Sequence, residues 1–323
     1  MASGANVPIS GGTDMQQVVP GDTIQPADFN EARTNINNIL SAPTSVTDLH
    51  GLNQGGVSVG AAASGATVLA LGAAGAFTEL QNDIQALNSF YGASTRPAIQ
   101  ADILVGDVIE ANQWNALMLD TKDRWDAPVK NSNFNTKTYP TSETWTTAGD
   151  GAWTGTLTST VTFTWSSAAE LNAWFNGGGG VGMEGSIIYS GSDAQTLSWQ
   201  TRLDNLGDVY LLKQSTVAGA GTNAGKGQVD QTTNYVTLNT YAGNTTYTND
   251  WANVESKVNN TATPTSVTVK MVFKDFDDLF PGVDEPVLGD TRIRGVLITP
   301  NPAGSGFNFP GPTNITQTPI VET

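Results

Sequence analysis

The chain has 323 residues, no cysteine and a net charge of -16, although only 14% of its residues are charged. The absence of cysteine excludes disulfides, thiolate metal sites and a cysteine nucleophile. The negative charge argues against partners such as nucleic acid or anionic membrane. We also find no apolar run long enough for membrane insertion and no secretion-signal pattern in residues 1–6.

A repeated segment marks the first third of the chain. Residues Gly21–Asn30 match Gly106–Asn115, with Gly, Asp, Ile and Asn identical and Phe29 aligned with Trp114. Each copy indicates a Gly-Asp turn, a buried isoleucine and the start of a helix, with Pro26 in the first turn of the first helix. The apolar faces of these helices carry Phe29, Ala32, Ile36 and Leu40 in one copy, and Trp114, Leu117, Thr121 and Trp125 in the other.

A further helix is predicted between the two copies. Thr78 and Gln81 form a capping-box pattern at its start, and Gly92 ends it. Its apolar face carries Leu80, Ile84, Leu87 and Tyr91. Residues 51–75 have few large side chains, which leaves two interpretations open: a flexible arm, or a segment packed closely against a partner.

From residue 135 onward the sequence is rich in threonine and in alternating patterns. Residues 156–165 alternate without a break, which predicts a strand with one face in a core. Ser167 and Glu170 predict the start of a short helix that ends at Asn176. A second helix carries Trp199 and is stopped by Gly207. Further strands are predicted at residues 185–190, 208–213, 235–241, 265–275 and 292–299.

These elements predict an α+β fold class, mainly β. Residues 1–134 form an N-terminal helical attachment region with the two repeats and the Gly/Ala-rich arm. Residues 135–323 form an antiparallel β-sandwich with short inserted helices.

Catalytic and cofactor motifs are not recognisable in the sequence. The single histidine, His50, has no nucleophile motif beside it, so we interpret it as a surface or turn residue. One histidine without cysteine cannot build a zinc site. Gly177–Gly180 lacks the following Lys-Ser/Thr of a phosphate-binding loop. We therefore expect no enzyme activity, no catalytic residues and no cofactor.

An acidic stretch lies between two predicted strands. It contains Asp275, Asp277, Asp278, Asp284, Glu285 and Asp290. Three interpretations are open: a glycosidase carboxylate pair, a calcium site on the first three aspartates, or a solvated loop. Because neither functional motif is complete, we favour the solvated loop and predict no metal site.

The eight tryptophans raise the alternative of a sugar-binding surface. Most of them are in register with apolar stripes and are predicted to be core; these are Trp114, Trp125, Trp165, Trp174 and Trp199. The others lie outside clear stripes, and burial is still the commoner state for this residue type; these are Trp145, Trp153 and Trp251. The candidates for glycan contact are Tyr241, Tyr247 and Trp251.

One further set of segments comprises Leu171–Gly178, the strand that follows, Trp199–Gly207 and the strand Ile293–Thr299. Together these segments resemble a module of virion structural and tail-associated, fibre-like proteins of tailed phages. The repeated Gly-Asp-x-Ile unit also resembles segments of such proteins. The resemblance covers about residues 165–300 and the two repeats, and it departs at Trp174 and in the glycine-rich strand after Gly180. It implies no catalytic residues.

The resemblance implies a virion component that is assembled in the host cytoplasm. It would be a tail, neck or baseplate-attached fibre, or a decoration protein, and its partners would be other virion proteins. The alternative is a receptor-binding adhesin that recognises host surface glycan. A third hypothesis is a hydrolase that works through the acidic stretch.

Self-association is expected from the narrow apolar faces of the three helices. Each helix buries few large side chains alone, which is small against the cost of ordering it. A homo-oligomer would supply the missing burial, and a trimer is favoured because the fibre-like proteins that the chain resembles are commonly trimers. Packing of the helices on the β domain of their own chain is the alternative. The residues assigned to assembly are Phe29, Ile36, Leu80, Ile84, Leu87 and Trp114.

Overall fold

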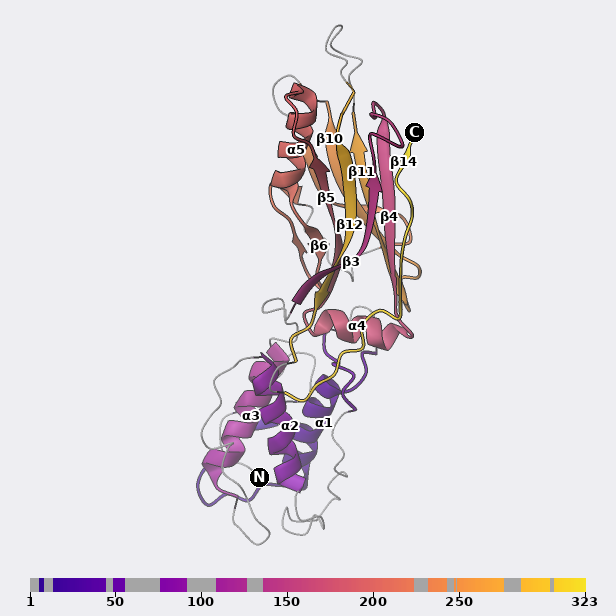
Figure 1. Cartoon of the computed structure of the whole chain (residues 1–323). Helices are drawn as coiled ribbons and strands as arrows, with labels where there is room; N and C mark the ends of the chain where they lie inside the picture. Colours follow the sequence, from indigo (N-terminus) through magenta and orange to yellow (C-terminus); the bar gives the residue numbers. More distant parts are fainter. Residues whose placement is uncertain are drawn as a thin grey trace. The chain divides into compact units, whose positions relative to one another are not determined.

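The computed structural model describes residues 6–8, 14–44, 49–55, 76–91, 109–126, 136–223, 232–242, 247, 249–275, 286–302 and 305–323. The chain divides into two compact units (Figure 1). The helical unit comprises residues 1–44, 48–130 and 301–309, and the β unit comprises residues 45–47, 131–300 and 310–323. The sequence placed the boundary between residues 134 and 135, and it contained no sign that residues 301–309 join the helical unit.

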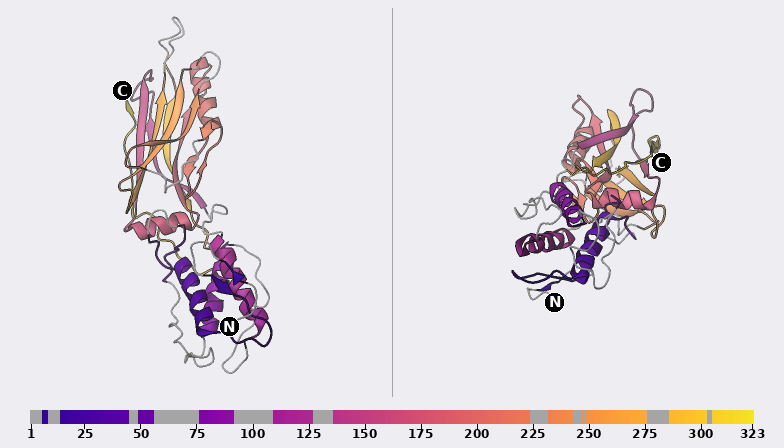
Figure 2. Two further views of the ribbon diagram at one scale, coloured as in Figure 1. Left: turned by 180° about the vertical axis from the view of Figure 1, so that it is seen from behind. Right: turned by 90° about the horizontal axis from the view of Figure 1, so that it is seen from below.

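The helical unit is built on α1 (Pro26–Leu40), α2 (Ala76–Tyr91) and α3 (Ala111–Asp126), with a short pair of strands, β1 (Asn6–Val7) and β2 (Met15–Gln16). Each of the three helices contacts the other two (Figure 2). α1 begins at Pro26 as predicted, and the carboxylate of Asp28 accepts a hydrogen bond of 2.8 Å from the backbone N–H of Gln25. This contact satisfies one of the free donors at the helix start.

The predicted start of α2 is wrong. The helix begins at Ala76, so Thr78 lies inside it and does not cap it. Phe77 explains the extra residues, because its buried ring lies 6.1 Å from the ring of Trp114 and holds this part of the helix against α3. Gln81 is buried within α2 instead of serving the cap. Most of the predicted arm, residues 56–75, lies outside the described residues.

The second repeat holds the segment that precedes the first repeat through side-chain hydrogen bonds. The indole N–H of Trp114 donates to the backbone oxygen of Gln16 over 3.1 Å. The side-chain amide of Asn115 bonds both backbone groups of Val18, accepting from its N–H at 2.8 Å and donating to its oxygen at 2.9 Å. The aromatic-Asn pair that closes the second copy therefore fastens the segment that precedes the first copy.

The side chains that we assigned to assembly form the core of the helical unit. All six are fully buried, at 0% exposure, within a single chain; they are Phe29, Ile36, Leu80, Ile84, Leu87 and Trp114. Phe90 adds to this core, with its ring 5.5 Å from Phe307 and 5.3 Å from Phe309. The expectation that the helices lack burial is thus corrected, because they and residues 301–309 supply it. The trimer stays a prediction, and these residues do not support it.

The β unit has an α+β, mainly β fold with two antiparallel sheets among its described residues (Figure 1). One sheet has the order β13-β4-β11-β10-β9-β8, with β14 also paired to β4, and the other has the order β3-β12-β5-β6-β7. The strands of the first sheet are β4 (Thr156–Thr164), β8 (Thr222–Asn223), β9 (Val236–Ala242), β10 (Trp251–Val258), β11 (Ser266–Lys274), β13 (Asn314–Gln317) and β14 (Val321–Glu322). Those of the second are β3 (Thr136–Trp145), β5 (Gly180–Ile188), β6 (Val209–Leu211), β7 (Thr216–Val217) and β12 (Asp290–Thr299).

Local sequence signals explain the centre of the β unit. β4 alternates as predicted, with Leu157, Val161 and Phe163 fully buried between the sheets. α4 (Ala168–Asn176) is capped by the Ser167 hydroxyl, which accepts from the Glu170 backbone N–H, and this confirms the predicted cap. α4 lies across one end of the sandwich (Figure 1).

The second inserted helix, α5 (Ala194–Leu206), packs against β5 along one side of the sandwich (Figure 1). It is capped by Asp193, whose carboxylate accepts from the Thr196 backbone N–H. It ends as predicted before Gly207, which adopts a φ of 60°. Trp199, Leu203 and Leu206 are buried as the apolar stripe predicts.

Several strands differ from the sequence prediction: β7, β8, β13 and β14 were not predicted, and three longer strands differ for reasons that the structure shows. β5 begins at Gly180, not at residue 185, because its glycines permit close packing: a Cβ on Gly182 would lie 2.1 Å from the oxygen of Val209. β3 was not predicted, since most of it is exposed and Pro140 interrupts its pattern. β10 was not predicted either, because it buries polar residues such as Asn253 and Ser256 and so lacks alternation.

Candidate binding site

His50 and Asp275, two residues considered for chemistry, are engaged within the fold. The half-buried ring of His50 stacks on Trp125 with centroids 4.0 Å apart, and its Nε2 lies 3.1 Å from the Trp125 backbone oxygen. Asp275 is 6% exposed, and its two carboxylate oxygens accept from the Gln195 side-chain amide at 2.9 and 2.8 Å. The solvated-loop interpretation is therefore wrong for Asp275, which α5 covers.

The rest of the acidic stretch is only partly described. Asp277, Asp278, Asp284 and Glu285 lie outside the described residues. Asp290 accepts a hydrogen bond of 3.1 Å from the backbone N–H of Thr147. Within the described ranges, no group of three or more His, Asp or Glu residues is placed to hold a metal ion.

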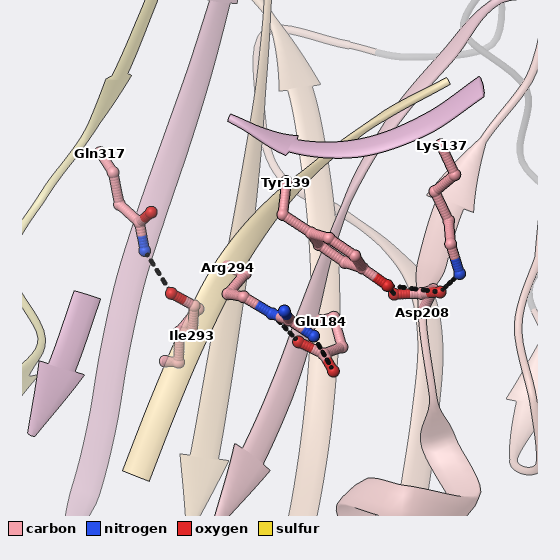
Figure 3. A network of polar contacts seen from close by, with 7 residues as sticks. All are labelled: Lys137, Tyr139, Glu184, Asp208, Ile293, Arg294 and Gln317. Atoms are coloured by element: carbon pink, nitrogen blue, oxygen red, sulfur yellow. Dashed lines mark hydrogen bonds and ion pairs between the residues drawn. The ribbon is translucent and has the colours of Figure 1, made fainter. Parts of the chain in front are cut away.

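A network of charged side chains covers part of the second sheet (Figure 3). Lys137 and Tyr139 of β3 both bond Asp208, and the hydrogen bond to Asp208 raises the pKa of Lys137. The guanidinium of Arg294 in β12 makes two hydrogen bonds, of 2.6 and 2.8 Å, to Glu184 in β5 and lies 3.8 Å from the centre of the Tyr139 ring. Because these charges satisfy one another, we interpret the network as the fastening of β3.

The β unit has a cavity of about 290 Å³ beside α5. Its wall consists of Leu197, Ser198, Thr201, Arg202, Asn205, Tyr241 and Tyr247. Positions 198, 202 and 205 face the same side of the helix because they are spaced by about one and two helical turns. Tyr241 comes from β9 and Tyr247 from the connection to β10, so the cavity joins segments that are distant in the sequence.

Arg202 forms the buried part of the cavity wall. Its side chain is 2% exposed and its guanidinium lies 4.1 Å from the centre of the Trp199 ring, which is a favourable cation–π distance. One guanidinium nitrogen, Nη1, lies 3.5 Å from the carboxylate of Asp250, which is 3% exposed. Neither Nη1 nor Nη2 has a hydrogen-bond partner among the described residues. Burial lowers the pKa of Arg202, and the nearby carboxylate of Asp250 opposes this effect.

The sequence candidates for glycan contact are brought together only in part. Tyr241 and Tyr247 line the same cavity, whereas Trp251 is half-buried in β10 and is not part of its wall. The Tyr241 hydroxyl lies 3.5 Å from the side-chain amide nitrogen of Asn205. Among the other tryptophans in question, Trp153 is fully buried and donates to the Thr291 hydroxyl, and Trp145 is half-buried.

Sequence reasoning missed the contribution of α5 to this cavity. The available signal was the polar spacing of Ser198, Thr201 and Asn205 beside the apolar stripe. Arg202 was a second signal, because it follows Trp199 by one turn and precedes Leu206 by one turn, so it adjoins the buried face. Its partner Asp250 is far away in the sequence, and no local pattern connects the two.

A second cavity, of about 450 Å³, lies in the helical unit between the start of the first repeat and residues 109–112 of the second. Its wall consists of residues 18–22, Ile24 and residues 109–112. Most of these residues are at least half-exposed, and the cavity brings together the two copies that the sequence identified as related.

Comparisons with known proteins found no relative of the chain: no family model, no curated protein and no solved structure matches it. In the described parts of the chain, none of the helices has the length and apolar character that crossing a bilayer requires. The argument for function therefore rests on the residues of this chain.

Proposed function

We propose that this chain is a non-enzymatic structural component of a tailed-phage particle. The helical unit would attach it to other virion proteins, and the β unit would contribute to the architecture of the particle. The proposal includes a tail, neck or baseplate-attached fibre or a decoration component, located in the virion, with a homotrimer as its favoured state.

One observation carries this proposal. Three of the segments that resemble the phage module are distant in sequence but meet in the fold as β5, α5 and β12. Residues Asp290 to Ile298 of β12 pair with β5 along the whole length of β5, and α5 packs against β5. These segments therefore form one substructure of the β unit, as a shared module requires.

The test compares particles of the virus that encodes this chain, produced with and without it. Electron microscopy of the two preparations should differ by a defined density, and supplying the chain in trans should restore it. Particles that look the same in both preparations would contradict the proposal.

A second candidate function is recognition of host surface glycan by the β unit. The observation that favours it is the cavity shared by α5, Tyr241 and Tyr247, because two aromatic side chains and several hydroxyl and amide groups converge there. The purified full chain should bind host cells at micromolar concentration. Absence of binding to host cells that the virus infects would exclude this function.

A further inference from the structure

We propose that the outer face of the second sheet around Arg292 is an interface between copies of this chain, and that Arg292 pairs there with a carboxylate of the neighbouring copy. The face comprises Tyr139, Ser186, Ile188, Arg292 and Arg294, and we call it the Arg292 surface. The inference rests on the homo-oligomeric state within the proposed function, and it names the residues that form the contact.

Arg292 lacks a carboxylate partner, unlike the other two arginines of the β unit. Nη1 of Arg202 lies 3.5 Å from the carboxylate of Asp250, and Arg294 makes two hydrogen bonds to Glu184. Arg292 has neither an ion pair nor a hydrogen bond with any described residue. A planar guanidinium forms its strongest hydrogen bonds with carboxylates and phosphates, so this group is available to an anionic partner.

The guanidinium of Arg292 is partly shielded from water but can still be reached. Its Nε is buried without a partner among the described residues, and so is the hydroxyl oxygen of Ser186, which lies opposite Arg292 in the strand register. The Nη1 and Nη2 atoms of Arg292 are not buried in this way and remain accessible. A carboxylate that reaches these two atoms would therefore meet a charge that water screens less than at an open surface.

The alternation of β12 places Arg292 on the outside of the sandwich. Side chains along a strand point to opposite faces in turn, and the neighbours Thr291 and Ile293 are fully buried in the core. Arg292 and Arg294 therefore point away from the core. Asp290 shares their face, but it accepts a hydrogen bond from a backbone N–H and forms no ion pair with Arg292 within the described ranges.

Exposed apolar side chains flank Arg292 on the same face. Ile188 of β5 lies two residues beyond Ser186 and is 57% exposed, the largest value among the exposed large apolar side chains that the structure describes. Tyr139 is 36% exposed, and its ring stacks on the guanidinium of Arg294 at the other end of the face (Figure 3). Arginine and tyrosine beside an apolar residue are the types that contribute most to protein–protein binding.

The charge of the chain favours a second copy as the partner. The chain has 30 Asp and Glu against 14 Lys and Arg, so another copy presents many carboxylates on its surface. Most contacts between two such chains are repulsive, and an unpaired arginine is a place where the contact is attractive. The helix side chains that the sequence assigned to assembly are buried within one chain. A homo-oligomer therefore needs a different surface, and the Arg292 surface can supply it.

The test measures the mass of the full-length protein by sedimentation equilibrium. Protein concentrations run from about 1 to 100 µM, at salt concentrations of about 0.05 and 0.5 M. The wild-type protein should associate in this range, and the association should weaken at the higher salt concentration because salt screens an accessible ion pair. A mass of 33.8 kDa, that of one chain, at every concentration would overturn the proposal.

Matched variants locate the interface. Arg292→Glu should weaken association about 100-fold, because it places a negative charge opposite a carboxylate. Lys257→Glu makes the same change of charge on the first sheet, where Lys257 contacts the ring of Tyr235, and should leave association unchanged. Ile188→Glu should weaken association about tenfold or more, whereas Val321→Glu, at a 50% exposed residue of the first sheet, should not.

Two further readings keep these variants decisive. Thermal unfolding shows which variants are folded, and Ile188→Glu alone carries the test if Arg292→Glu is not, because Ile188 is exposed. Equal weakening by the two control variants would show an effect of overall charge and would overturn the proposed interface.

The outcomes separate this inference from the function on which it rests. Association that Arg292→Glu and Ile188→Glu leave unchanged would overturn the Arg292 surface and leave the homo-oligomer standing. A monomeric wild-type protein would remove both, while the virion role is tested separately by particles made without the chain. Variants that associate normally but no longer join particles would show that this surface meets a different virion protein, which also overturns the interface proposed here.

Discussion

Asp275, the first residue of the acidic stretch, is predicted to stabilise the β unit through its hydrogen bonds with Gln195. Gln195 is fully buried in α5, and its amide nitrogen donates to both carboxylate oxygens of Asp275 at the end of β11. Gln195→Met removes this donor but keeps the length and unbranched shape of the side chain. A hydrogen bond to a buried charge contributes about 1.5–3 kcal/mol, so the β unit should lose about that much stability.

In a unit of this size, the loss corresponds to a fall of about 3–12 °C in melting temperature. Calorimetry of the full chain measures it, and hydrogen exchange at the backbone amides of β11 assigns the transition to the β unit. Gln200→Met, half-exposed on the same helix, is the control and should change stability by less than about 0.5 kcal/mol. A Gln195→Met variant as stable as this control would refute a structural role for Asp275.

Three further predictions concern other parts of the chain. Burial and the neighbouring carboxylate of Glu79 raise the pKa of Asp83 from 3.8 to about 6, so the folded helical unit binds a proton in this range that the unfolded chain does not. The helical unit should therefore gain stability as the pH falls from neutral through about 6. Asp83→Asn should be more stable than the wild-type protein near neutral pH, by less than about 1 kcal/mol because the group is partly solvated. Equal dependence of stability on pH in the two proteins would contradict this prediction. Asn115→Ala should cost about 1–3 kcal/mol and speed amide exchange at Val18, which loses both of its side-chain partners; unchanged exchange at Val18 would show that the clamp is not formed. Gly182→Ala should destabilise the β unit by about 3 kcal/mol or more, because the added Cβ would lie 2.1 Å from the Val209 oxygen and push β6 away from β5. A free energy of unfolding equal to that of the wild-type protein in chemical denaturation would contradict the observed register.

Elements with a complete local signal were predicted correctly from the sequence. The strand β4 has an uninterrupted alternation, and the cap of α4 needs only Ser167 and Glu170. Pro26 likewise marks the start of α1 without tertiary information. In each of these cases the deciding contacts lie within a few residues along the chain.

Elements that depend on distant contacts were not predicted. The glycines of β5 look like breakers until the close approach of β6 and β11 is known, because only then does the lack of a side chain become a requirement. β10 was missed for a similar reason, because its buried polar residues obscure the alternating pattern of a strand. Asn253 is held by hydrogen bonds to Thr240 and Glu255, which the sequence does not reveal.

The residues of the candidate site show the same difference between local sequence signals and contacts that are distant in the sequence. Tyr241 and Tyr247 were proposed from their residue type and position in a predicted loop region. The place of Arg202 in the site depends on the burial of its guanidinium against Trp199 and on its contact with Asp250, which is distant in the sequence. Sequence patterns indicate which side chains are polar, but they do not indicate which of them remain without partners after folding.

The most direct test of the central claim is the amount of this chain in purified virus particles. Quantitative mass spectrometry across a density gradient should find the chain at a constant ratio to the major capsid protein throughout the particle peak. A chain that stays in the soluble fractions, with no constant ratio in that peak, would contradict its role as a virion component.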